Sequence, residues 1–272
     1  MPYRQAHWFV GLVLTMILLG FWGSYWSAIA AVPLAFHVHA ISASAWLVLL
    51  IVQSLAIHRR SNALHRQLGL ASFALFPLLI LGFVMIIDIS AQGYVAARND
   101  FAVHNGPSFG IGMAIAIAAY LTLFYLALKH RRNVKLHAGY LLATPLILFE
   151  SPFSRVMGDY LPWLNIINSP GPQVVQDTIA LSDALSIVFA LALYALNRKH
   201  STPWLVAAAF MAAQAIAMWF APFVPALGPM FAAYARIPLG LTASAGIAAG
   251  ALAGWLGWRA GGGARRVVAK AV

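Results

Sequence analysis

The dominant pattern along the chain is a series of long apolar runs separated by short polar turns. A helix needs about 20 mostly apolar residues to cross a bilayer, and eight runs are compatible with that length. We expect membrane helices at about 7–29, 34–57, 65–89, 106–128, 137–157, 179–197, 203–221 and 237–258. The sequence therefore predicts an all-α integral membrane protein whose residues 1–272 form one transmembrane domain.

A repeated phrase divides this pattern. The stretch HRRSNALHRQLG at 58–69 and the stretch HRRNVKLHAGYL at 130–141 both place a basic run before a histidine, at a separation of 72 residues. We therefore interpret 33–105 and 106–178 as approximate two-helix repeats, followed by three further helices in 179–272. A pseudo-twofold axis along the membrane normal would bring His65 and His137 toward each other.

Composition and charge agree with a membrane location. Hydrophobic residues make up 62% of the chain and charged residues 8%, and no cysteine is present, which excludes disulfides and thiolate ligands. The net charge of +11 comes from residues that flank apolar spans, so we expect membrane lipids with anionic headgroups as partners and no nucleic acid.

The basic residues also predict orientation. With eight helices, 14 of the 17 Lys and Arg residues lie on one side and only Arg98, Arg155 and Arg236 on the other. Cytoplasmic loops collect Lys and Arg. We expect both termini in the cytoplasm and a multi-pass protein of the bacterial inner membrane.

The paired histidines are the leading candidates for chemistry. His65 and His137 would open two facing helices on the cytoplasmic side. Two imidazoles from facing helices commonly hold a b-type haem. The alternative is that each histidine lies at the end of its helix, at the level of the lipid headgroups, and hydrogen-bonds only the backbone or a lipid phosphate. His58 and His130 lie in the basic turns, where we expect them to be solvated.

A second histidine set lies toward the periplasmic side. His37 and His39 are two residues apart, so on a helix only one of them can face a given ligand. Either one, with His104, could bind a second cofactor. Pro107 suggests that the next helix starts after His104 and leaves it in a loop. His104 also lies about five residues further from its basic turn than His37 does from its own, a difference in depth of roughly 7 Å on helical rise.

The same half contains most of the acidic residues. Asp88, Glu150 and Asp183 would lie in or beside spans, where an ionisable group needs a partner or a function. With His39 and His104 they form an alternative site for a divalent transition metal. A proton path, a substrate pocket and a polar plug are further interpretations of this outer cluster.

Small residues mark one face of the last helix. Gly246, Gly250 and Gly254 form a ridge at which another helix can approach closely. We expect packing within the chain, with a homo-oligomer contact as the alternative.

The phrases LHRQLG (64–69) and KLHAGYLLATPLIL (135–148) resemble a group of bacterial multi-spanning membrane proteins of unknown function. The order of histidines over four successive helices is also similar to dihaem transmembrane b-type cytochromes. That resemblance implies one haem at His65 and His137 and another at His37 or His39 with His104.

Three functions follow as hypotheses. The first is a b-type haem protein that moves electrons across or within the membrane, with quinone or a redox protein as partner. The second is a metal-dependent membrane enzyme with a periplasm-facing His/Asp/Glu site acting on a lipid or small molecule. The third is a transporter or a structural or assembly subunit. Whether the chain is an enzyme is left open by the sequence.

Overall fold

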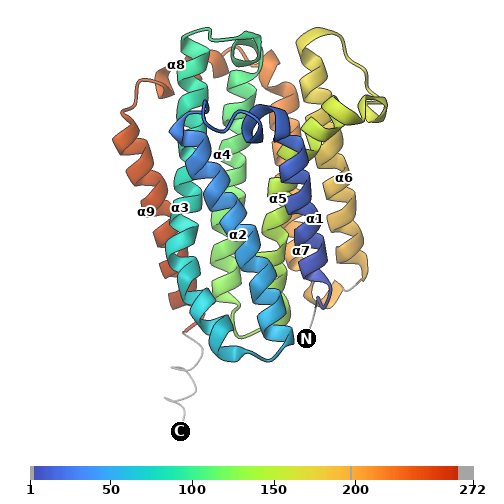
Figure 1. Cartoon of the computed structure of the whole chain (residues 1–272), viewed down its shortest axis with the longest axis vertical. Helices are drawn as coiled ribbons and strands as arrows, with labels where there is room; N and C mark the ends of the chain where they lie inside the picture. The colour runs from blue at the N-terminus through green and yellow to red at the C-terminus, as the bar shows by residue number, and fades with distance from the viewer. Residues whose placement is uncertain (1–2, 197, 263–272) are drawn as a thin grey trace.

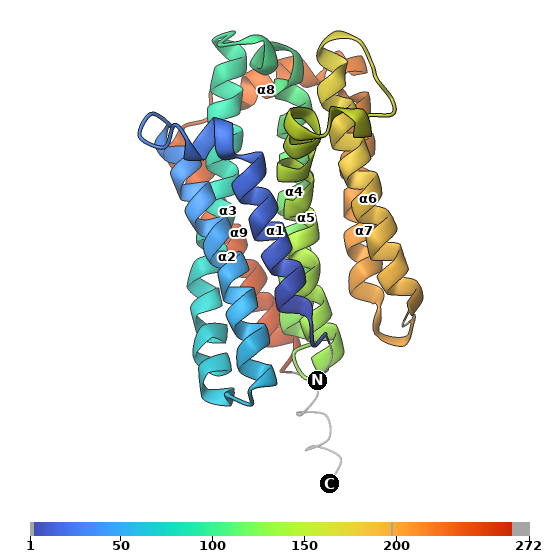
Figure 2. The same ribbon diagram turned by 45° about the vertical axis from the view of Figure 1, so that its right-hand side comes forward.

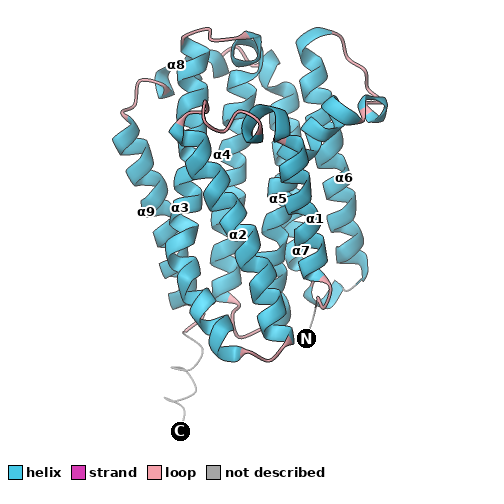
Figure 3. Cartoon of the chain, viewed as in Figure 1, coloured by secondary structure: helices cyan, strands magenta, loops and turns pink. Residues whose placement is uncertain are grey.

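The computed structural model describes residues 3–196 and 198–262. Within this part of the chain every regular element is helical and no strand occurs (Figure 3). The long helices are α1 (Ala6–Gly20), α2 (Leu34–His58), α3 (Asn62–Val95), α4 (Asp100–Lys129), α5 (Val134–Tyr160), α6 (Val174–Leu196), α7 (Thr202–Phe220) and α9 (Leu239–Ala260). The expected all-α class is confirmed.

Six helices in the described residues, α2, α3, α4, α6, α7 and α9, are long and apolar enough to cross a membrane. This result supports a multi-pass membrane protein. Helix α1 has only 15 residues and continues into a short π-helix, Trp22–Trp26. Helix α5 has 27 residues but carries Glu150 and Arg155 in its second half. A short helix that the pattern did not predict, α8 (Leu227–Tyr234), precedes α9.

The long helices run side by side in one bundle (Figure 1). Helix α4 is central and packs against α3, α5, α7 and α9, whereas α2 packs mainly on α3 and α1 on α5. Helices α6 and α7 form an adjacent pair at one edge of the bundle (Figure 2). The start of α1 and the end of α9 lie at the same end of the molecule (Figure 1).

The two basic turns place the repeated histidines alike. His65 is the fourth residue of α3 and His137 is the fourth residue of α5. Each backbone N–H donates to the carbonyl oxygen of the residue before its helix, at 3.0 Å to Ser61 and 2.9 Å to Asn133. The two imidazoles therefore start from equivalent positions one turn into their helices.

The start of α4 differs from the sequence expectation. The Asn99 side chain accepts a hydrogen bond from the backbone N–H of Ala102 at 2.8 Å, so the helix is capped there and begins at Asp100. Pro107 lies inside α4. The prediction that His104 lies in a loop before this helix was wrong, because a capping asparagine several residues upstream outweighs the proline as a start signal.

A buried aromatic layer crosses the middle of the bundle. Phe76 stacks on Phe124 with ring centroids 3.9 Å apart, and both rings contact Trp46, at 5.5 and 5.7 Å. The Trp46 indole N–H donates to Thr144 Oγ1 at 2.9 Å, and the Tyr120 hydroxyl donates to the Thr144 carbonyl oxygen at 2.9 Å. The polar atoms of this layer are thus paired, as burial requires.

The glycine ridge of α9 faces α3. A methyl group on Gly250 would lie 2.8 Å from Pro77 Cα, and one on Gly246 would lie 2.9 Å from Val84 Cγ2. A methyl group on Gly254 would lie 3.3 Å from the rings of Phe73 and Phe124. In the described residues the ridge therefore serves packing within the chain.

Candidate functional site

Two cavities, each of about 470 Å³, lie at opposite ends of α2–α5. The inner cavity is beside the two basic turns, and the outer cavity is near the starts of α2 and α4. Both volumes fall in the range of small-molecule and cofactor sites. The aromatic layer contributes Trp46 and Phe124 to the inner lining, while Phe83 lines the outer cavity and contacts the Tyr120 ring at 5.2 Å. The two cavities are therefore separated by packed rings.

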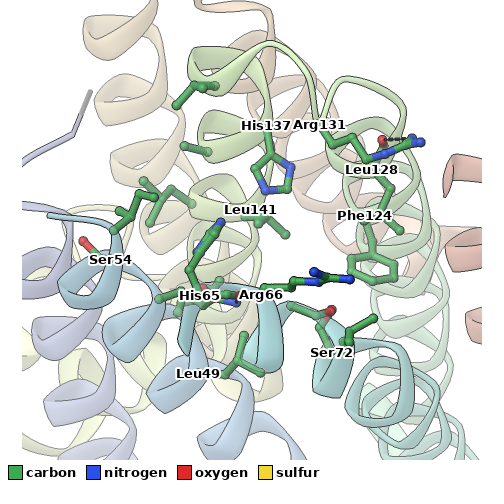
Figure 4. Close-up of a pocket in the computed structure, with 18 of the residues that line it drawn as sticks. Leu49, Ser54, His65, Arg66, Ser72, Phe124, Leu128, Arg131, His137 and Leu141 are labelled. Carbon is green, nitrogen blue, oxygen red and sulfur yellow. Dashed lines mark hydrogen bonds between the residues drawn. The ribbon is translucent and has the colours of Figure 1, made fainter. Parts of the chain in front are cut away.

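His65 and His137 line the inner cavity together. Figure 4 shows both imidazoles pointing into it, each toward the other. His137 Nδ1 lies 2.8 Å from the Ala127 carbonyl oxygen. Because a carbonyl oxygen only accepts, the proton is on Nδ1, and the neutral ring leaves a lone pair on Nε2.

His65 is held by its backbone. Its carbonyl oxygen accepts from Gln53 Nε2 at 3.2 Å, which ties the first turn of α3 to α2. Its Nδ1 is buried and has no hydrogen-bond partner. An unpaired buried nitrogen is costly without a ligand or a water molecule. The pair thus offers ring nitrogens from two helices to one cavity.

His58 also lines the inner cavity, contrary to the expectation that it is solvated. Its Nδ1–H donates to the Ser54 carbonyl oxygen at 2.6 Å, and its Nε2 is buried without a partner. His130, its counterpart in the repeat, stacks on Tyr140 instead, with centroids 5.8 Å apart. The difference arises because α2 extends through His58, whereas α4 ends at Lys129.

The charged groups of the inner cavity are basic. Arg66 and Arg131 line it, and no Asp or Glu of the described chain does. Arg131 Nη1 donates to the Trp258 carbonyl oxygen at 2.7 Å, and its guanidinium lies 4.1 Å from the centroid of that residue's ring. The inner cavity can therefore bind a ligand that combines an apolar body with acidic groups.

The outer cavity receives His39 but not His37. His39 contacts the edge of Phe83 at 4.8 Å, and its Nδ1 is buried without a partner. His37 instead shares a hydrogen bond of 2.9 Å with the Tyr25 hydroxyl. Of the two alternatives left open by the sequence, His39 is the one that faces the interior.

His104 is exposed and does not line the outer cavity. The residues of α4 that line this cavity are Phe101, Ala102, Phe109, Met113 and Ala116. The structure therefore does not bring His104 beside His39.

The acids of the outer half serve different contacts. Glu150 lines the outer cavity, and its Oε2 accepts from Gln214 Nε2 at 3.3 Å. Asp183 is fully buried behind it, with neither carboxyl oxygen hydrogen-bonded. Asp88 accepts from Thr242 Oγ1 at 2.8 Å and thereby joins α3 to α9.

No group of three His, Asp or Glu residues in the described ranges is arranged to hold a metal ion. The five residues expected at a metal site are dispersed. His39 and Glu150 line the outer cavity, and Asp183 is buried. His104 is exposed, and Asp88 lies at the contact between α3 and α9. Sequence position alone could not show this, because the separation depends on how each helix is rotated.

Comparison with known proteins adds no family. No protein-family model matches the chain, and no curated protein or solved structure matches it. The functional argument therefore rests on the two cavities.

Proposed function

We propose that this protein is a membrane b-type haem protein that transfers electrons, and that His65 and His137 would hold the haem iron in the inner cavity. The observation that carries the proposal is the convergence of these repeated histidines on one cavity of about 470 Å³. Bis-histidine ligation from facing helices is an established way for helix bundles to hold haem. Quinone or a redox protein would be the electron partner.

The residues of the inner cavity fit this cofactor. The hydrogen bond from His137 Nδ1–H to Ala127 fixes the tautomer and the ring orientation that an axial ligand needs. Leu50, Phe73 and Phe124 supply apolar walls for the flat ring of the cofactor. Arg66 would pair with the acidic side groups of the ring. A bound haem supplies a one-electron iron couple.

The topology belongs to the same proposal. Eight membrane crossings, an internal repeat of α2–α3 and α4–α5, and cytoplasmic termini would put the inner cavity on the cytoplasmic side of a bacterial inner membrane. The start of α1 and the end of α9 lie at the same end of the bundle, which supports an even number of crossings (Figure 1). The chain resembles multi-spanning bacterial membrane proteins in two short motifs, and it resembles dihaem b-type cytochromes in the order of its histidines.

An absorption spectrum tests the proposal. Purified protein, expressed with ample haem supply, is recorded after air oxidation and again after dithionite reduction. We expect a Soret band that sharpens on reduction, and its loss in both His65→Ala and His137→Ala. The matched controls are His130→Ala and His104→Ala, because neither ring lines the inner cavity.

Size-exclusion profiles of all variants would exclude unfolding as the cause of lost colour. A colourless wild-type protein would overturn the proposal, as would full colour in either His65→Ala or His137→Ala. The metal-dependent enzyme and the transporter have no comparable convergence of residues in their support.

A further inference from the structure

The outer cavity is walled by aromatic rings. Phe21, Trp26, Phe83 and Phe109 line it from four different segments of the bundle. Phe36 and Phe101 also line it and are 38% and 41% exposed, so the cavity reaches the surface beside these two rings. Two exposed polar residues, Arg98 and Asn99, line it as well. Aromatic walls favour a flat ring as occupant, through stacked or edge-to-face contacts.

Two polar atoms in this lining have no partner. The Trp26 indole N–H is buried and unpaired, and so is His39 Nδ1. An indole N–H can only donate, so the missing partner of Trp26 is an acceptor such as a carbonyl or hydroxyl oxygen. Trp26 ends the π-helix Trp22–Trp26, a distortion that often occurs at functional sites.

The charges of the lining oppose each other. Glu150 and Arg155 line the outer cavity together with Arg98, which is exposed, and Asp183 lies within electrostatic range of Glu150. An anion would meet Glu150 and Asp183, whereas a cation would meet Arg98 and Arg155. An uncharged ligand avoids both repulsions and leaves the opposite charges to balance each other.

We infer that the outer cavity binds a membrane quinone: an uncharged planar ring whose oxygen atom accepts the Trp26 N–H and lies beside His39. The tail would leave through the opening between Phe36 and Phe101. This inference concerns binding alone and stands without a haem in the inner cavity.

The test is equilibrium binding of radiolabelled decylubiquinone to the full-length protein in lipid nanodiscs. We expect saturable binding to the wild-type protein. Trp26→Phe keeps a ring but removes the donor, and His39→Gln keeps a polar side chain but removes the imidazole. Each should weaken binding roughly tenfold, the loss expected for one unmade hydrogen bond in a buried site.

Matched controls carry the same substitutions outside the cavity. Trp22→Phe changes an exposed residue of the same π-helix, and His104→Gln changes an exposed histidine of α4. Both should bind like the wild type. Absent saturable binding, or equal affinity in all four variants, would overturn the inference. Displacement by oleate would also overturn it, because a charged amphiphile would then occupy the site.

A double variant separates this inference from the haem proposal. His65→Ala with His137→Ala should lose colour and keep decylubiquinone binding. Loss of binding in that variant would mean that the quinone binds in the inner cavity, and it would contradict binding in the outer cavity. Colour and binding are independent readouts, so either proposal can fail alone.

Discussion

The inner cavity collects three histidines and two arginines, with no acid of the described residues. The outer cavity has the same volume and also two arginines, Arg98 and Arg155, but combines them with one histidine, Glu150 and an unpaired indole. Ligand nitrogens from two helices suit a metal macrocycle. Single donors around an aromatic space suit an uncharged ring. Equal size and similar helices therefore do not imply equal function, because the side chains at each end decide what can bind.

Substitution in the aromatic layer between the cavities should have the largest effect. Phe76 is fully buried and stacks on Phe124, so Phe76→Ala should lower the free energy of unfolding by about 3–5 kcal/mol. It should also join the two cavities. The measurement is reversible denaturation in mixed micelles. Leu78→Ala, at a position 48% exposed on the same helix, is the control and should cost much less. Equal losses would mean that the layer is no more tightly packed than the surface.

A smaller loss of stability is expected at the close contact between α9 and α3, next to the aromatic layer. A methyl group on Gly250 would lie 2.8 Å from Pro77 Cα, which is backbone and cannot turn away. Gly250→Ala should therefore destabilise the fold by about 1–3 kcal/mol in the same assay. Gly240→Ala, with nothing within 4 Å, provides the control. An unchanged Gly250→Ala protein would show that α9 can shift freely and would weaken the close-packing account.

The smallest effect is expected at Asp88, which joins two helices, in contrast to Glu150, which lines the outer cavity. Thr242→Val removes the hydrogen bond to Asp88 and should cost about 1–2 kcal/mol of stability. Because neither residue lines the outer cavity, decylubiquinone affinity should not change. Thr15→Val, whose hydroxyl bonds only its own helix at Gly11, is the control. A changed affinity in Thr242→Val would mean that this acid belongs to the site after all.

The sequence predicted the helices well because apolar length is a local property. Each of the eight expected spans overlaps a helix in the described residues, and six of these helices are long and apolar enough to cross a membrane. The count of eight crossings stays a prediction. The end of each helix was less predictable. Asn99 caps α4 before Pro107, and α2 continues as far as His58, and these two boundaries changed the positions of two histidines.

The candidate site was predictable only where the chain repeats itself. The matched spacing of His65 and His137 identified the pair, and their common place in the fourth position of a helix follows from it. The outer set failed to assemble because rotation about each helix axis is a tertiary property. His104 is exposed and does not line the outer cavity, and Asp88 accepts a hydrogen bond from Thr242 instead. The unpaired Trp26 N–H had no signal in the sequence beyond an aromatic residue at a helix end.

The haem content per chain is the measurement that tests the central claim most directly. Haem is determined as the pyridine haemochromogen and protein by quantitative amino-acid analysis, for the wild type, His65→Ala and His39→Ala. Among the described residues His39 is the single histidine of the outer cavity, whereas His65 and His137 share the inner one. We therefore expect one haem per chain in the wild type and in His39→Ala, and none in His65→Ala. Two haems per chain, none in the wild type, or a haem that survives His65→Ala would contradict the account.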